Sequence, residues 1–140
     1  MTFQDNTKIT DRCTGMGEGK GKALAAEAGE YGCTAVNLTP GFMRTEAVLE
    51  MFGVSEENWR EGGKVDPTFA VSETPAYVAR AVASLATDPD VTRLNCHSLS
   101  AGALAKEYGF TDADGSSPDP ARHFEDFMTT GTAPDPNDYR

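Results

Sequence analysis

The sequence has few large aliphatic or aromatic side chains for its length. Leu, Ile, Val and Phe together make up 23 of its 140 residues. That is about 16%, below the ~20% at which a high net charge favours disorder. Alanine carries much of the 39% apolar fraction, and its side chain buries little surface. A compact domain of this length buries about two thirds of its unfolded surface. We therefore expect either that part of the chain is unfolded or that it folds together with something else.

Other absences exclude whole classes of protein. There is no run of Lys or Arg and the net charge is −10, which argues against nucleic acid and anionic membranes as partners. No stretch approaches the ~20 apolar residues of a membrane span, and residues 1–13 lack the apolar core of a secretory signal. The three cysteines, Cys13, Cys33 and Cys96, are widely spaced and form no C-x-x-C. They predict reduced thiols in a cytoplasmic protein, with no zinc site or other metal site.

The chain alternates short strand and helix patterns, which is typical of an α/β protein. The clearest helix covers residues 74–87, where Thr74 is an N-cap and Pro75 takes the first helical position. Short strands are predicted at 33–38 and 92–99. Further helices are predicted at 22–31, 45–52, 101–108 and 121–128.

The two ends differ in composition from the middle. Residues 1–13 are polar and predict an N-terminal tail, and residues 129–140 are rich in Thr, Gly, Pro and Asp, which predicts a disordered C-terminal tail. Residues 14–128 remain as one α/β domain in which helices predominate.

A Pro-Gly turn follows the strand at 33–38, and Thr45 begins the next helix four residues beyond Gly41. Ligands bind at the carboxyl ends of strands in open α/β sheets. Glycine lets a backbone approach a ligand closely, and a Thr hydroxyl both donates and accepts hydrogen bonds. The turn is therefore a candidate binding site, although a Pro-Gly turn taken alone is more often structural.

From Thr34 to about Asp119 the chain resembles the C-terminal part of the short-chain dehydrogenase/reductase family. The stretches that carry the resemblance are TAVNLTPGFMRTE, VLEMFGVSEENW, SETPAYVARAVASLATDPDV and YGFTDADGS. The resemblance implies a partial Rossmann fold, in which 33–38 and 92–99 are the last two parallel strands and 74–87 is the crossover helix. It also implies that the segment between the Pro-Gly turn and this helix is a substrate lid.

The same resemblance implies that NAD or NADP binds at the turn, with Thr45 and the backbone at 42–43 against the nicotinamide carboxamide. The cofactor-binding residues that it implies are Pro40, Gly41, Phe42, Met43 and Thr45. The residues expected to form an apolar wall over the site of hydride transfer are Phe42, Met43, Met51, Phe52 and Trp59. Without the family, these five residues are more readily interpreted as plain core.

The family's catalytic Tyr-x-x-x-Lys pair has no counterpart in the sequence. It is expected near residues 10–14, but the first tyrosine is Tyr31, and no Tyr lies four residues before Lys8, Lys20 or Lys22. We therefore assign no catalytic residue. The leading interpretation is an NAD(P)-dependent oxidoreductase, acting on a carbonyl or alcohol substrate, that is truncated and weak or inactive by itself.

Two other interpretations remain at this point. One is a non-catalytic remnant of the family that acts as an oligomerisation or interaction module, paired with a second copy or with a complementary chain. The other is a truncated or misjoined reading frame without a selected function.

The glycine-rich segment Thr14–Gly21 literally fits the family's cofactor signature, Thr-Gly-x-x-x-Gly-x-Gly. It lies far closer to Pro40 than in the family, and residues 6–13 do not form the apolar strand that such a loop follows. Two interpretations stay open: a chance match within an altered helix, and a true cofactor loop joined to the rest by an internal deletion.

Overall fold

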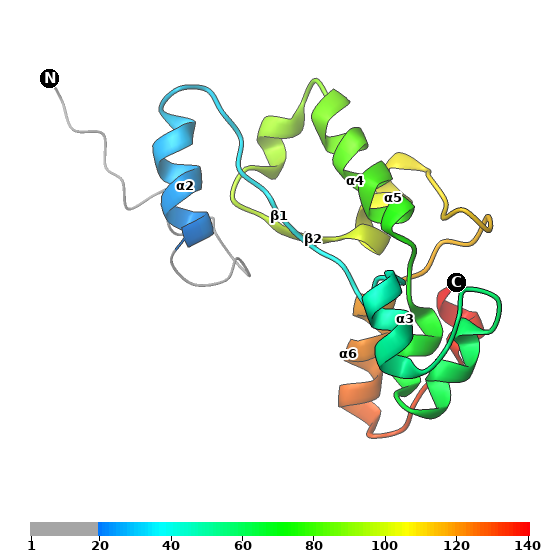
Figure 1. Ribbon diagram of the computed structural model, residues 1–140. Helices are drawn as coiled ribbons and strands as arrows, with labels where there is room; N and C mark the ends of the chain where they lie inside the picture. The colour runs from blue at the N-terminus through cyan, green and yellow to red at the C-terminus, as the bar shows by residue number, and fades with distance from the viewer. Residues whose placement is uncertain (1–19) are drawn as a thin grey trace, which may run out of the picture. The chain divides into compact units, whose positions relative to one another are not determined.

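The computed structural model describes residues 20–140, whose backbone is mainly helical (Figure 1). The elements in chain order are α2 (Lys20–Gly29), β1 (Asn37–Thr39), α3 (Glu46–Phe52), η1 (Trp59–Lys64), η2 (Pro67–Val71), α4 (Pro75–Thr87), η3 (Val91–Leu94), β2 (Ser98–Ser100), α5 (Ala101–Tyr108), α6 (Pro120–Thr130) and η4 (Pro136–Tyr139), where η marks a 3-10 helix. The N-terminal tail predicted at 1–13 and most of the glycine-rich segment 14–21 lie outside the described residues. None of the helices within 20–140 is long and apolar enough to cross a bilayer.

These elements form two compact units, where the sequence predicted one domain over 14–128. The sheet unit contains the described residues up to Thr39 together with 85–99, and the motif unit contains 40–84 together with 100–140. Each unit is described here by itself.

The sheet unit contains a parallel pair of strands, β1 and β2. The amide of Cys96 donates to the carbonyl of Ala35 over 2.8 Å, and the amide of Asn37 donates to the carbonyl of His97 over 2.9 Å. The residue numbers rise together on both sides of these bonds, so the strands run in the same direction. Parallel strands need a crossover connection, and α4 lies between them in the chain. The predicted fold class, a partial α/β Rossmann arrangement in which helices predominate, is confirmed.

The second strand is shorter than the prediction of 92–99. Its first half is the 3-10 helix η3, and only Ser98–Ser100 is a strand. The physical cause lies at Cys96, whose φ of 67° is left-handed and interrupts the extended backbone. Just before it, the Oδ1 atom of Asn95 accepts from the amide of Ala35 over 2.9 Å. A side chain thus takes a position that a backbone carbonyl holds in a regular ladder.

Cys96 is 2% exposed and lies in one cluster with Ala25 and Ala35. Cys33 is exposed and carries a free thiol, as the sequence predicts. Cys13, the third cysteine of the chain, lies outside the described residues.

The core of the motif unit is built around α4 and α5. Its fully buried members include Phe69, Val71, Tyr77, Ala81 and Leu104. The Tyr77 ring lies edge-on to Phe110, with 5.3 Å between the ring centroids, and its hydroxyl donates to the carbonyl of Pro118 over 3.1 Å. The buried phenol is therefore paired, as the burial of a polar group requires.

The C-terminal segment is ordered, which differs from the disordered tail predicted at 129–140. After α6 the chain forms η4 and returns to the start of α6, where the amide of Asp119 donates to the carbonyl of Tyr139 over 2.8 Å. Tyr139 is 7% exposed, its hydroxyl donates to Asp126 over 2.6 Å, and its ring lies edge-on to His123 at 5.1 Å. One aromatic anchor thus orders a segment whose average composition predicts disorder.

Candidate functional site

The motif that the sequence singled out is an extended segment paired with Glu73. The amide of Glu73 donates to the carbonyl of Phe42 over 2.9 Å, and the amide of Arg44 donates to the carbonyl of Glu73 over 2.8 Å. These two bonds make a parallel bridge centred on Met43. They fix the path of the backbone between the Pro-Gly turn and α3.

The bridge leaves one donor facing away from it. Because the carbonyl of Phe42 and the amide of Arg44 both point at Glu73, the intervening amide of Met43 points to the other side of the segment. Within residues 20–140, no protein group accepts a hydrogen bond from this amide. The carbonyl of Met43 accepts from the amide of Thr45 over 2.8 Å. The segment therefore offers a backbone donor to a ligand.

Thr45 lies at the end of this segment and begins α3. Its Oγ1 atom accepts from the amide of Val48 over 3.3 Å, which is an N-cap bond. Because Oγ1 is the acceptor in this bond, the hydroxyl hydrogen remains available for donation. The side chain is only half-buried, so a ligand can reach it.

Gly41 is required for close packing. A Cβ atom at this position would lie 2.4 Å from Cγ and 2.5 Å from Cβ of Pro120, the first residue of α6. Contacts this short force a movement of the turn or of α6. The sequence interpretation assigned the glycine to the approach of a ligand. The structure adds the approach of a helix, which no local pattern reveals.

The side chain of Glu73 lies beneath the turn, and sequence reasoning missed it. Its Oε1 atom accepts from the amide of Gly41 over 3.2 Å. The residue is fully buried, and Oε2 has no hydrogen-bond partner among the described residues. Burial raises the pKa of Glu73 to about 7, the Gly41 amide and the Arg44 guanidinium oppose this rise, and Asp112 adds to it. The available signal was a carboxyl side chain two residues after the apolar run Phe69–Val71 and just before α4.

Arg44 joins the motif to the segment predicted as a lid. Its guanidinium group is buried, lies 4.1 Å from the centre of the Trp59 ring, and donates to the carbonyl of Ser72 over 2.6 Å. It also donates to Glu56 over 3.0 Å and lies 3.9 Å from the carboxylate of Asp112. The contacts of the Arg44 guanidinium with the Trp59 ring and with the Glu56 carboxylate hold the lid segment against the motif.

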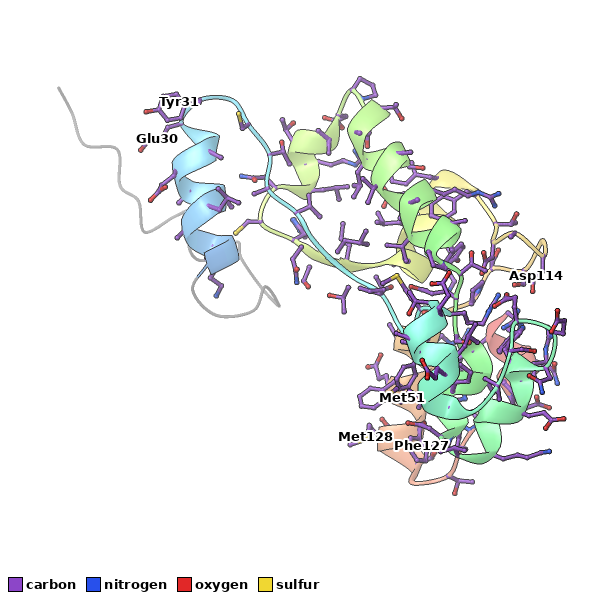
Figure 2. All side chains as sticks on the ribbon, in the orientation of Figure 1. Glu30, Tyr31, Met51, Asp114, Phe127 and Met128 are labelled. Carbon is purple, nitrogen blue, oxygen red and sulfur yellow. The ribbon has the colours of Figure 1, made fainter. Side chains whose placement is uncertain are left out.

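The structure brings together only part of the predicted apolar wall. Phe42 and Phe52 pack against Phe69, with ring centroids 5.7 Å and 4.0 Å away, and Trp59 lies 6.4 Å from the same ring. Phe69 is fully buried, and it was absent from the predicted set. Met51 is 68% exposed and does not belong to the cluster (Figure 2). These aromatic side chains therefore form the core beneath the motif.

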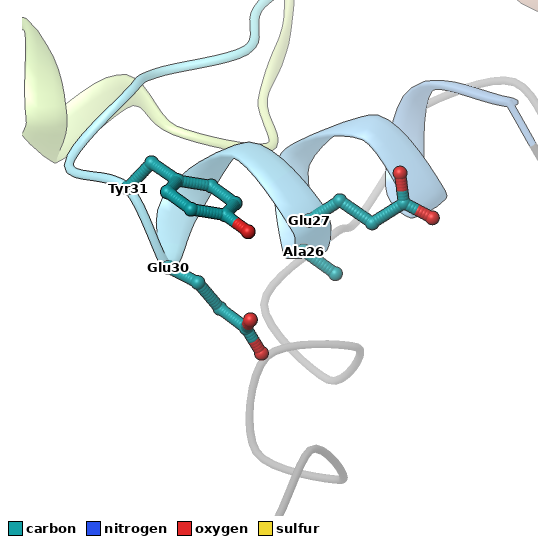
Figure 3. Close-up of a pocket in the computed structure, with 4 residues that line it drawn as sticks. All are labelled: Ala26, Glu27, Glu30 and Tyr31. Carbon is teal, nitrogen blue, oxygen red and sulfur yellow. The ribbon is translucent and has the colours of Figure 1, made fainter.

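A pocket of about 260 Å³ occurs in the sheet unit, on α2 and the turn that follows it (Figure 3). Its lining residues are Ala26, Glu27, Glu30 and Tyr31. Two carboxylates among four residues do not suit an anionic dinucleotide. None of these residues belongs to the cofactor motif, so the pocket is not part of the candidate site.

The fold and the motif together are those of a partial Rossmann-type α/β protein. No family model matches the chain. It is 32% identical to dehydrogenase/reductase SDR family member 1 of Mus musculus over 126 residues, which cover 85% of this chain and 38% of that protein. It is 31% identical to the Homo sapiens protein of the same name over 107 residues, which cover 72% of this chain and 34% of that protein.

These relatives place the chain in a family of oxidoreductases: it belongs to the short-chain dehydrogenase/reductase family, as the sequence predicts. The chain spans little more than a third of the length of the curated relatives that it matches. No comparison assigns a role to the motif residues Pro40, Gly41, Phe42, Met43 and Thr45, which stay predicted as cofactor-binding.

Proposed function

We propose that the segment Pro40–Thr45 binds the nicotinamide end of NAD or NADP. The observation that carries the proposal is the amide of Met43, which faces away from Glu73 and has no protein acceptor within the described residues. A nicotinamide carboxamide presents a carbonyl that accepts and an amino group that donates hydrogen bonds. The Met43 amide and the Thr45 hydroxyl suit this group. When bound, the cofactor supplies the hydride that is exchanged with a carbonyl or alcohol substrate.

We further propose that these 140 residues alone reduce carbonyl compounds weakly or not at all. The family's proton donor is the Tyr of a Tyr-x-x-x-Lys pair, which this sequence lacks. Tyr77 and Tyr139 of the motif unit do not replace this proton donor, because the hydroxyl of each already donates a hydrogen bond within the protein. The Tyr77 hydroxyl donates to Pro118, and burial raises its pKa, which weakens it as an acid at neutral pH. The Tyr139 hydroxyl donates to Asp126.

Titration of NADH and of NADPH into the purified chain, followed by nicotinamide fluorescence, tests the binding proposal. We expect Thr45→Ala to weaken binding by about 5–10-fold, the loss of one hydrogen bond, and Thr45→Ser to restore it. Thr129→Ala is the matched control, because that exposed hydroxyl donates to the carbonyl of Glu125 on α6, away from the motif segment. Equal affinity of Thr45→Ala and the unmodified chain would contradict the proposal.

A reductase assay with the same protein tests the activity proposal. We expect oxidation of NADH or NADPH to stay near background across a panel of aldehydes and ketones. Turnover well above background would show that another residue acts as the proton donor.

The sheet favours a second candidate function, an interaction module that pairs with a second copy or a complementary chain. Parallel sheets are normally buried on both faces, yet β1 and β2 have three residues each and no third strand joins them within residues 20–140. Size-exclusion chromatography with light scattering, over a range of concentrations, tests this candidate. We expect a dimer or a larger assembly, and a monomer that melts cooperatively would contradict it.

A further inference from the structure

The side chain of Glu73 is buried at a position where a neutral side chain would lose less solvation free energy. It is fully buried, and the burial of a carboxylate carries a large desolvation penalty unless the charge is paired. Its Oε2 atom has no partner among the described residues. The nearby carboxylates of Asp112 and Asp119 repel its charge, and Arg44 is the cation that opposes them. Packing alone therefore does not account for a carboxyl group here.

The contacts of Glu73 all converge on one short segment. Its backbone amide and carbonyl bond to Phe42 and Arg44, and its Oε1 atom accepts from the amide of Gly41. One residue thus bonds to positions 41, 42 and 44, on both sides of Met43, whose amide is the donor offered to a ligand. The two backbone bonds are possible with any residue except proline at position 73, but the bond to Gly41 depends on the side chain.

We propose that Glu73 is a positioning residue whose carboxylate, through the amide of Gly41, holds the 41–45 segment in its ligand-binding conformation. The inference deepens the proposed function and, for its effect on NAD(P), rests on it. A hydrogen bond to a charged acceptor is roughly twice as strong as one to a neutral acceptor. Protonation of Glu73 weakens the hydrogen bond from the Gly41 amide to Oε1. The proton would lie on Oε2, and no acceptor for it is present among the described residues.

The position of Gly41 therefore responds to pH near neutrality. Burial brings the pKa of Glu73 to about 7. The charged or titratable groups that face it are Arg44 from the motif segment, Tyr77 from α4, and Asp112 and Asp119 from the loop before α6. A variant at position 73 removes the titration of Glu73 and keeps these four groups in place.

The first test uses the free protein and needs no cofactor. We expect the backbone 1H and 15N resonances of Gly41 to titrate between pH 5.5 and 8.5 with a midpoint near 7 in the unmodified chain. In Glu73→Gln, which keeps an acceptor oxygen without the charge, this transition is absent. Glu125→Gln, on the exposed part of α6, is the matched control and keeps it. A Gly41 resonance that does not titrate in the folded, unmodified chain overturns the inference.

The second test measures the affinity for NADH over the same pH range. We expect the affinity of the unmodified chain to rise by about 3–10-fold from below to above pH 7 and that of Glu73→Gln to stay constant. Glu73→Ala should bind more weakly at every pH. Identical pH profiles for the unmodified chain and Glu73→Gln overturn the inference. If NADH binds no variant at any pH, the proposed function fails, and the Gly41 resonance alone decides the role of Glu73.

Discussion

The substitution Phe69→Ala tests whether the aromatic cluster beneath the motif holds the motif unit together. Phe69 is fully buried, its ring stacks on Phe52 at 4.0 Å, and it fills the space against Gly62, where a Cβ atom would lie 2.4 Å from the ring. Removal of this ring leaves a cavity between η1 and η2 that the helices cannot fill without moving. A buried Phe→Ala substitution costs about 3–5 kcal/mol of unfolding free energy.

Trp59 makes the measurement specific to this unit. It is the single tryptophan of the chain, is 4% exposed, and lies 6.4 Å from the Phe69 ring. Urea unfolding followed by its fluorescence therefore reports on the cluster. With a denaturant dependence of about 1–3 kcal/mol per molar urea, we expect the midpoint to fall by at least ~1 M.

Phe124→Ala is the matched control, because it deletes the same atoms from a side chain that is 54% exposed. We expect it to cost less than about 1 kcal/mol, since its ring is already half in water. If Phe69→Ala is too unstable to purify, Phe69→Leu should give a smaller loss of about 1–1.5 kcal/mol. A loss for the Phe69 variants no larger than for Phe124→Ala would refute the assignment of these rings to the core.

Substitutions at Glu73, Tyr139 and Gly102 probe contacts that only the structure reveals. Because burial raises the pKa of Glu73 from 4.5 to about 7, the folded state holds this proton more tightly than the unfolded state, and stability is lost as pH rises through 7. From pH 5 to 8 the unmodified chain should lose roughly 1–3 kcal/mol relative to Glu73→Gln in urea unfolding, and a constant difference would contradict the burial of the carboxyl. Tyr139→Ala should lower the melting temperature and expose residues near the C-terminus to protease, whereas Tyr139→Phe, which loses only the bond to Asp126, should have a smaller effect. Equal protease resistance of Tyr139→Ala and the unmodified chain would show a loose C-terminal segment. In Gly102→Ala the new Cβ would lie 2.8 Å from the carbonyl oxygen of Pro118, so we expect a loss of about 1–3 kcal/mol, and unchanged thermal melting would contradict this packing of α5.

The predictions that the structure confirms rest on short-range patterns. The Thr74-Pro75 start places α4 at Pro75–Thr87, and the helix predicted at 45–52 is α3, which follows its N-cap Thr45. The helix predicted at 101–108 is α5, and Gly109, with a φ of 74°, follows it as a glycine after a helix often does. Each signal involves residues within one or two helical turns, so the local sequence suffices to specify it. The family resemblance draws on the same stretches and is supported by the relatives.

These short-range patterns do not predict features that depend on contacts between residues far apart in the chain. The strand expected at 92–99 is shortened because Cys96 is left-handed and Asn95 bonds to Ala35, sixty residues away in the chain. The disordered tail expected at 129–140 is ordered because Tyr139 packs between His123 and Asp126. Composition describes an average over a segment, whereas one well-packed side chain can order it.

The sequence by itself determined the family of this protein, the positions of its main helices and the segment predicted to bind the cofactor. Only the tertiary structure decided what lies beneath that segment. Glu73 reaches Gly41 across 32 residues of chain, and Pro120 packs against the same glycine from α6. The physical reason is that buried hydrogen bonds and close contacts depend on where elements meet in space. In the motif unit, where large apolar residues are few, a single ring such as that of Phe69 contacts several others.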